Sequence, residues 1–465
     1  MTLLEPREIP PLFGLGRVHF IAIGGAGMSG VAQGYITRGF LVSGSDQVDS
    51  EALRVLSEQG ASVWVGHDPK HVAGADTVVV SSAIRDDNVE LVEARQRGIP
   101  VIHRSLALAS LMQGYQVVSV AGTHGKTTTT AMVVAGLQGA GHDPSYVIGG
   151  TLLTTGMNAY ISQGQQFVIE ADESDGSFRQ YPTNIAVITG IETDHLDNWG
   201  TPERYAQGFQ EFATGSTVST VILCADDPGG QALARTLVRQ GRRVMTYGSS
   251  DGSDLRLSDI RAISGTAVVT YGNWSLPIRV GVRGVHNLHN AAAALCVGEV
   301  LGVDRGGFLA GLATFGGTAR RFQYLGLARE IRVVDDYAHH PTEVAATIAT
   351  ARLSAGVGRV IVCFQPHLYS RTQHFADEFG AALAAADEVV VLDVYPARED
   401  PILGVTGELV ARAVAARGVR VHYVPREEDA VEALVPLAKP GDLVLTVGAG
   451  SVTAIGPQLL ERLAP

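Results

Sequence analysis

Short apolar runs recur along the chain, and most are followed by a glycine-rich or polar turn and then by a longer segment with helical spacing of apolar residues. Strands buried on both faces of a parallel sheet read as continuous apolar runs, so these segments predict strands. The predicted strands cover residues 17–23, 41–46, 77–84, 100–103, 116–121, 167–172, 185–191, 221–226, 243–248, 331–338, 359–365, 388–395, 420–424 and 442–448. Their alternation with helices predicts an α/β fold with mostly parallel sheets.

The chain contains three such α/β segments, and its 465 residues are too many for a single hydrophobic core. We expect three domains, with an N-terminal Rossmann-like domain over residues 1–106, a central domain over 107–317 and a C-terminal Rossmann-like domain over 318–465. Residues 250–285 alternate short polar and apolar runs, which predicts a small β insertion. Residues 288–302 predict a helix.

Composition narrows the class of protein. The chain is 46% hydrophobic and 18% charged with a net charge of −12, and its lack of a long basic run argues against a nucleic-acid partner. No stretch reaches the ~18 apolar residues of a membrane span, and the N-terminus lacks the apolar core of a signal peptide. Three widely spaced cysteines fit buried thiols in a reducing compartment. We therefore expect a cytoplasmic protein with no membrane partner.

The stretch AGTHGKTTTT (121–130) lies between a predicted strand and a helix. Backbone N–H groups and the positive end of a helix meet at such a corner, which makes it an anion site. Lys126 and Thr127 indicate a nucleoside triphosphate with Mg²⁺, and we expect the lysine side chain at a solvent-facing phosphate site. The usual glycine five residues before Gly125 is replaced by Val120. The alternative is a capped helix with a solvated lysine.

A second glycine motif, Gly25-x-Gly27-x-x-Gly30, follows the first predicted strand, and Asp46 ends the next one. This pattern is typical of a nicotinamide site, but the glycines require only that a diphosphate approach a helix N-terminus. Any nucleotide diphosphate satisfies that requirement, and tight packing is a further alternative. We favour phosphate binding.

Acidic residues gather at EADESD (170–175), at the carboxyl end of a predicted strand. Strand alternation sends Glu170 and Asp172 to one face, and Glu173 and Asp175 follow in the loop. Beside a phosphate loop these acids indicate Mg²⁺ ligation, although a solvated acidic loop is the common alternative. His195 also follows a strand and could reach a second metal, or it could be a hydrogen-bonded core histidine.

Polar groups also mark the later part of the chain. His286, Asn287 and Asn290 share a predicted helix with faces that could read an adenine edge, unless Asn287 only caps that helix. The Arg320–Arg321 pair lies at a turn-rich boundary, where a solvated pair would be ordinary. The run DDYAHHPTE (335–343) crowds ionisable groups beyond a strand end, which indicates a functional site.

Together these segments resemble the Mur ligases of bacterial peptidoglycan synthesis. The resemblance is carried by IGGAGMSG, AGTHGKTTTT, EADESDGSF, TDHLD, GVHNLHNAAAA, ARRFQ, DDYAHHPTE, FQPHLYSRT and VGAGSV, in the order of the family, over residues 18 to about 452. The short phosphate loop is the form found in this family. The runs GGAGMSG and DDYAHHPTE are similar to its alanine-adding branch.

The resemblance implies a UDP-binding domain, a central ATPase domain and a C-terminal ligase domain. It implies ATP-dependent ligation of L-alanine to the lactyl carboxylate of UDP-N-acetylmuramate through an acyl phosphate, with Mg²⁺ as cofactor and Mn²⁺ able to substitute. It further implies a cytoplasmic monomer or weak homodimer. Two other classes of protein explain less of the sequence. A dehydrogenase would leave the phosphate loop without a role. A nucleotide-dependent switch protein would leave the first domain and residues 335–343 without a role.

The resemblance also implies a role for each residue that matches a motif of the family. The implied catalytic residues are Lys126, His195, His339 and Arg371. The implied ATP-binding residues are Gly122, Thr123, Gly125, Lys126, Thr127, Thr128, His286, Asn287, Asn290, Arg321 and Asp336. The implied UDP-substrate residues are Gly25, Ala26, Gly27, Met28, Ser29, Asp46, Ser81, Ser82 and His124. The implied metal ligands are Thr127, Glu170 and His195.

The run Pro366–Thr372, PHLYSRT, departs from the family pattern, which usually has an arginine where this chain has Leu368. Arg371 remains, and a guanidinium can pair with the carboxylate of alanine or with the acyl phosphate. We therefore expect Arg371 to carry the anion recognition of this loop, with His339 or His340 as a hydrogen-bonding partner. The alternative is that Arg371 pairs with a surface acid.

Overall fold

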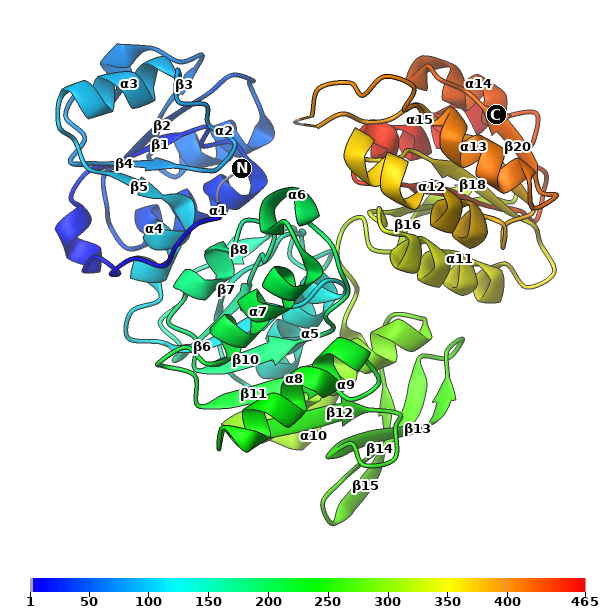
Figure 1. The fold of residues 1–465 in the computed structure, drawn as a ribbon, viewed down its shortest axis with the longest axis horizontal. Coiled ribbons are helices and arrows are strands. Elements are labelled where there is room, and N and C mark those ends of the chain that lie inside the picture. Colours follow the sequence, from blue (N-terminus) through cyan, green and yellow to red (C-terminus); the bar gives the residue numbers. More distant parts are fainter. Residues whose placement is uncertain (1–2, 398, 465) are drawn as a thin grey trace. The chain divides into compact units, whose positions relative to one another are not determined.

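The computed structural model describes residues 3–397 and 399–464. In these ranges the chain forms three sheets with connecting helices, drawn in Figure 1. The predicted α/β class and the mostly parallel pairing are confirmed. The chain forms two compact units: the first holds the residues up to Asp259 with Ala267–Val280 and His289–Phe315, and the second holds Ile260–Thr266, Gly281–Leu288 and the residues from Gly316 onward. The finer division at residues 106 and 317 stays a prediction.

The N-terminal sheet has the order β3-β2-β1-β4-β5, with parallel pairing throughout. Its strands are β1 (Val18–Ile21), β2 (Val42–Asp46), β3 (Ser62–Val65), β4 (Thr77–Val80) and β5 (Val101–His103). Its helices are α1 (Ala26–Thr37), α2 (Glu51–Glu58), α3 (Val89–Gln96) and α4 (Arg104–Leu111). The order along the chain changes direction between β1 and β4, and sheets of this kind bind ligands at the carboxyl ends of the strands at such a point.

The central sheet has the order β15-β14-β13-β12-β11-β10-β6-β9-β7-β8. Its strands are β6 (Gln116–Ala121), β7 (Ser145–Val147), β8 (Ala159–Tyr160), β9 (Gln166–Glu170), β10 (Ile185–Ile188), β11 (Thr220–Cys224), β12 (Val244–Gly248), β13 (Leu255–Arg261), β14 (Thr266–Tyr271) and β15 (Trp274–Arg279). Its helices are α5 (Lys126–Gly139), α6 (Leu196–Trp199), α7 (Pro202–Ala213), α8 (Pro228–Arg239), α9 (Val285–Leu301) and α10 (Arg305–Thr314). The phosphate-loop strand β6 lies between β10 and β9, so the loop is supported on both sides.

The C-terminal sheet has the order β16-β17-β21-β18-β19-β20, with only β16 shown antiparallel to its neighbour. Its strands are β16 (Gln323–Ala328), β17 (Ile331–Asp336), β18 (Val360–Phe364), β19 (Glu388–Val391), β20 (Arg420–Tyr423) and β21 (Leu443–Val447). Its helices are α11 (Pro341–Ala355), α12 (Tyr369–Leu383), α13 (Glu408–Ala415), α14 (Ala430–Leu434) and α15 (Ile455–Leu463).

Every predicted strand occurs, but the apolar pattern missed β3, β7, β8 and β16. Strand β3 is a mostly exposed edge strand, and β8 has only two residues, so neither carries a buried apolar run. The region predicted as a β insertion forms β13–β15, which extend one edge of the central sheet. Within the described ranges, no helix has the length and apolar character needed to cross a membrane.

Candidate active site

The glycine motif at residues 121–130 forms a strand–loop–helix corner. Strand β6 ends at Ala121, the loop passes through Gly122 and Gly125 with φ of 128° and 80°, and α5 begins at Lys126. Glycine adopts such φ values with little strain. The first N–H groups of α5 have no partner inside the helix and point outward with its dipole, so they favour a bound anion.

Gly122→Ala is expected to reduce ATP-dependent activity by at least ~100-fold, because even small misplacements of catalytic groups cost this much. A Cβ there would lie 2.2 Å from the Thr189 hydroxyl oxygen and 2.8 Å from the Thr189 backbone nitrogen. The matched control is Gly141→Ala, because Gly141 also has a positive φ of 81° but has open space around a Cβ. Steady-state kinetics and ATP calorimetry test this; equal losses in both variants would assign the effect to backbone strain alone.

The lysine of the loop does not extend into solvent, contrary to the sequence-based expectation. The Nζ atom of Lys126 donates to the Gly122 carbonyl at 2.7 Å, to the Thr123 carbonyl at 3.2 Å and to Glu173 Oε1 at 2.9 Å. Burial would lower the pKa of Lys126, but Glu173, Asp172 and Glu170 outweigh it and leave the pKa raised. The lysine is therefore a cation held inside the loop.

Two of the predicted metal ligands meet directly. The Thr127 hydroxyl donates to Glu170 Oε1 at 2.8 Å, while Glu170 Oε2 accepts from the Gly149 backbone at 2.7 Å. His195 sits in a left-handed conformation (φ 53°) before α6, and its Nε2 lies 3.9 Å from Glu173 Oε1. The same Nε2 lies 3.6 Å from Asp194 Oδ2, so His195 has two acidic neighbours, Asp194 and Glu173.

The predicted strand alternation of Glu170 and Asp172 is wrong, because β9 ends at Glu170. Asp172 lies in the following loop, where its carboxylate accepts from the Ser174 backbone at 3.0 Å. Burial would raise the pKa of Asp172, but the charges of Lys126 and His195 lower it overall. The carboxylate therefore stays ionised beside the phosphate loop.

The other residues of the loop region mainly hold it together. The Thr123 hydroxyl donates to the Glu192 carbonyl at 2.8 Å, and Thr128 is buried in the first turn of α5. His124, predicted to contact the UDP substrate, has Nε2 2.9 Å from Glu192 Oε2, beside the phosphate loop.

Helix α9 carries the predicted adenosine residues. It begins at Val285, so Asn287 lies inside the helix and is not its cap, and the Asn287 amide donates to the Arg283 carbonyl at 2.6 Å. Asn290 reaches the phosphate loop: a Cβ on Gly125 would lie 2.7 Å from Asn290 Oδ1. The structure thus brings Asn290 to the loop.

Next to Asn290 the structure adds a pair that the sequence analysis missed. His289 Nε2 lies 2.9 Å from Asp226 Oδ2, beyond the carboxyl end of β11, and 3.2 Å from the Ser249 hydroxyl beyond β12. Burial would raise the pKa of Asp226, but hydrogen bonds from Ser249, Ser250 and His289 lower it to about 2. No local motif joins these residues, so the sequence carried no signal for the pair.

At the first glycine motif, α1 starts directly after Gly25, and Asp46 Oδ2 accepts from the Gly24 backbone at 3.0 Å. The side chain of Ala26 lies outside the described residues. Met28 is buried, so its side chain supports the helix from the core. The guanidinium of Arg104 lies against Gly27, where a Cβ would sit 2.0 Å from Arg104 Nη1. Arg104, which the sequence analysis missed, supplies a cation at this helix N-terminus.

Ser82, one of the two predicted residues after β4, links the N-terminal sheet to the acidic loop. Ser82 donates to Asp175 Oδ2 at 2.9 Å and lies 3.1 Å from His103 Nε2, whereas Ser81 and Ser29 are half-buried. Burial lowers the pKa of His103 to about 4. The acidic loop is therefore tied to the carboxyl edge of the N-terminal sheet.

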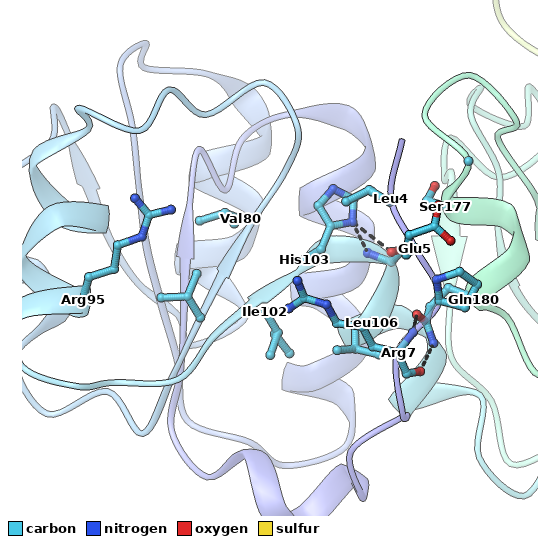
Figure 2. Close-up of a pocket in the computed structure, with 14 residues that line it drawn as sticks. Leu4, Glu5, Arg7, Val80, Arg95, Ile102, His103, Leu106, Ser177 and Gln180 are labelled. Atoms are coloured by element: carbon cyan, nitrogen blue, oxygen red, sulfur yellow. Dashed lines mark hydrogen bonds between the residues drawn. The ribbon is translucent and has the colours of Figure 1, made fainter. Parts of the chain in front are cut away.

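A cavity of about 290 Å³ lies next to β4 and β5 and is shown in Figure 2. Val80, His103 and Leu106 face it from one side, and the segment from Leu4 to Arg7 closes it. The Arg7 backbone and the Gln180 side chain exchange two hydrogen bonds of 2.7 Å. The N-terminal segment is thus hydrogen-bonded to the segment that follows the acidic loop.

In the second unit, Asp336 ends β17 and is buried, and burial raises its pKa to about 6. It accepts from the Phe322 backbone at 2.7 Å and from the Ala338 backbone at 2.8 Å. Arg321 lies 5.1 Å from the ring centre of Tyr337, as a cation over an aromatic face. These residues gather at the carboxyl end of one strand, as DDYAHHPTE indicated.

Arg371 is buried at the start of α12, and its Nη1 lies 3.4 Å from His367 Nδ1. His367 is therefore one partner of Arg371, and the ring centres of His339 and His367 lie 5.9 Å apart. A hydrogen bond from Arg371 to His339 or His340 stays a prediction. Leu368 is also buried, which explains how an apolar residue is accommodated at this position.

A loop of N–H groups, an enclosed lysine and a threonine–glutamate pair at the carboxyl edge of a parallel sheet define a phosphate-loop enzyme that acts on a nucleoside triphosphate. Comparison with known proteins narrows this class. Residues 17–116 match the Mur ligase family, catalytic domain; residues 120–298 match the Mur ligase middle domain; and residues 320–450 match the Mur ligase, glutamate ligase domain.

Individual proteins that resemble this chain support the same family. The chain is 56% identical to the UDP-N-acetylmuramate–L-alanine ligase of Cutibacterium acnes, over 100% of this chain and 99% of that protein. It is 51% identical to the ligase of the same name from a Nocardioides species, over 100% of both. A crystal structure of UDP-N-acetylmuramate–alanine ligase from Thermotoga maritima superposes with a TM-score of 0.82 at 29% identity, covering 96% of this chain and 98% of that one. The chain belongs to the Mur ligase family, whose members are ATP-dependent ligases.

Proposed function

We propose that this protein joins L-alanine to the lactyl carboxylate of UDP-N-acetylmuramate at the expense of ATP, in peptidoglycan precursor synthesis. The observation that carries the choice of substrates is the 56% identity to an alanine-adding ligase over the whole chain. The phosphate loop with its enclosed lysine supports ATP as the energy source. The cytoplasm, which supplies ATP and UDP-linked sugars, is the proposed location.

The chemistry proceeds in two steps. A lactyl carboxylate oxygen attacks the γ-phosphorus of ATP, the bond from that phosphorus to the β-bridging oxygen breaks, and ADP leaves. The neutral amine of alanine then attacks the acyl carbon to form the carbon–nitrogen bond, the carbon–oxygen bond to phosphate breaks so that phosphate leaves, and the nitrogen releases one proton. The first step brings one anion onto another, so its barrier is mainly electrostatic. Lys126 is the cation within the loop that offsets this charge.

Mg²⁺ fits the donor set beside the loop. Hard cations favour oxygen ligands, and Thr127 and Glu170 offer oxygens 2.8 Å apart. Glu173 Oε2 is buried and accepts no hydrogen bond within the described part of the chain, as expected of an atom that awaits a cation. With His195 these residues would hold the ion, which when bound would neutralise phosphate charge.

The remaining proposed roles follow from position. Gly25, Gly27 and Arg104 lie where a diphosphate would meet the start of α1, and Asp46 lies where a ribose would follow. Asn290 approaches the ATP loop. Arg371 and His339 offer a cation and a hydrogen-bonding ring for alanine or the acyl phosphate, while Arg321 and Asp336 remain proposed ATP contacts.

The test is release of phosphate from ATP with UDP-N-acetylmuramate and single amino acids. Phosphate should appear at a rate that depends on both co-substrates, with L-alanine preferred and the amide product identified by mass spectrometry. NADH and NADPH should give no heat of binding in calorimetry. Phosphate release that ignores either co-substrate would contradict the proposal.

A further inference from the structure

The N-terminal sheet buries a carboxylate among histidines, away from the phosphate loop. Glu90, on α3, is fully buried. Its Oε1 lies 2.7 Å from His71 Nδ1. Its Oε2 accepts from the Ser45 hydroxyl at 2.5 Å and lies 3.4 Å from both His19 Nε2 and His67 Nδ1. The reaction described above uses none of these groups.

The protonation of this cluster is determined by Glu90. Burial would raise the pKa of Glu90, but hydrogen bonds from His19, Ser45 and His71 outweigh it and lower the pKa to about 2. An ionised carboxylate has no proton to give, so the Ser45 hydroxyl must donate to it. The Ser45 hydroxyl has a single proton, so it cannot donate a second hydrogen bond.

The tautomer of His67 follows from that of Ser45. The Ser45 oxygen lies 2.8 Å from His67 Nδ1 and can only accept there, so the proton of this bond belongs to Nδ1. In the neutral imidazole, a proton on Nδ1 leaves Nε2 as an acceptor. The neutral form of His67 therefore offers Nε2 as a hydrogen-bond acceptor.

His67 lies where a nucleotide base is expected. It follows the carboxyl end of β3, and the preceding Gly66 backbone donates to the Asp46 carbonyl at 2.7 Å. In sheets of this order the diphosphate meets the first glycine turn and the ribose meets the acid that ends β2. The base then continues from β2 toward β3, two neighbouring strands that Figure 1 labels in the N-terminal sheet.

We propose that His67 Nε2 accepts the N3–H of uracil and so selects uridine over cytidine nucleotides. This rests on the proposed function, because it specifies the base of the UDP substrate. Uracil N3 carries a hydrogen, whereas cytosine N3 is an acceptor that would face the lone pair of Nε2. Ser45 and Glu90 are positioning residues that hold the proton on Nδ1.

The test is calorimetry with UDP and CDP on the wild type, His67→Phe and Ser45→Ala. The wild type should favour UDP by at least ~10-fold, the effect of leaving one hydrogen-bonding pair unmade. His67→Phe should bring the ratio close to one, and Ser45→Ala should reduce it. The matched control is His422→Phe, since His422 also pairs with a glutamate, Glu388, at 3.0 Å but lies in the C-terminal sheet. That variant should keep the wild-type ratio.

Nitrogen-15 NMR of the histidines provides a second readout, because it distinguishes Nδ1–H from Nε2–H directly. His67 should carry its proton on Nδ1 in the wild type and lose this preference in Ser45→Ala. If His67→Phe does not fold, the NMR tautomer and the Ser45→Ala ratio decide.

Equal binding of UDP and CDP by the wild type, or an Nε2–H tautomer at His67, would overturn the assignment. The proposed ligase would still stand if phosphate release needed both co-substrates. A wild type that binds neither nucleotide would also overturn the assignment of His67, while phosphate release would still decide whether the protein is the proposed ligase.

Discussion

Lys126→Ala is expected to lower the rate of ligation by roughly 10³-fold, which is the scale of removing one group that stabilises transition-state charge. The Nζ atom lies among two loop carbonyls and Glu173, so the cation is already located where the triphosphate would enter. Steady-state phosphate release with saturating UDP-N-acetylmuramate and L-alanine measures the loss. Activity within tenfold of the wild type would contradict the assignment of this loop to phosphate binding.

The same substitution should also destabilise the protein, because it leaves the Glu173 carboxylate, 1% exposed, without its cation. We expect the free energy of unfolding to fall by about 3 kcal/mol, as for other broken buried ion pairs. The double variant Lys126→Ala with Glu173→Gln is the control: it should recover most of the stability and none of the activity. Recovery of both would mean that the lysine has only a structural role.

Arg371→Ala is expected to lower kcat/KM for L-alanine, or kcat itself, by about 100-fold, the scale of a lost charged hydrogen bond. The guanidinium is buried and Nη1 lies 3.4 Å from His367 Nδ1, whose ring stacks on Tyr395 at 5.8 Å. An arginine held in this way at the carboxyl end of β18 is pre-positioned for a carboxylate or an acyl phosphate.

The matched control for Arg371 is Arg417→Ala. Arg417 lies in the same unit and bonds Asp377, an exposed acid, at 2.9 Å, so its removal should leave the kinetics unchanged. Thermal melting of both variants separates folding from function. If Arg371→Ala retained wild-type kinetics, the run PHLYSRT would not be where alanine or the acyl phosphate is bound.

The phosphate loop could be predicted because all of its determinants are local. A buried strand, two glycines at positive φ and a helix that begins with lysine and threonine occupy one short run of the chain. The strand-end position of Asp46 was predictable for the same reason, since a carboxylate that ends a parallel strand lies at the ligand edge of its sheet.

Residues without a motif could not be found in this way. Arg104 begins α4, yet its guanidinium lies against Gly27 on α1. Asp226, in the loop after β11, pairs with His289 on α9. Nothing in the spacing of these residues indicates that they meet, because each contact depends on how helices and strand ends pack against one another.

By itself, the sequence determined the α/β class, the order of the strands along the chain and the phosphate loop, since apolar runs, glycine turns and helix starts are properties of short segments. The tertiary structure alone decided that Lys126 turns inward to Glu173, that Asp172 leaves the strand face expected for it, and that Arg371 bonds His367. Side-chain direction, burial and charge pairing depend on neighbours that come from distant parts of the chain, and only the packed sheets bring those neighbours together.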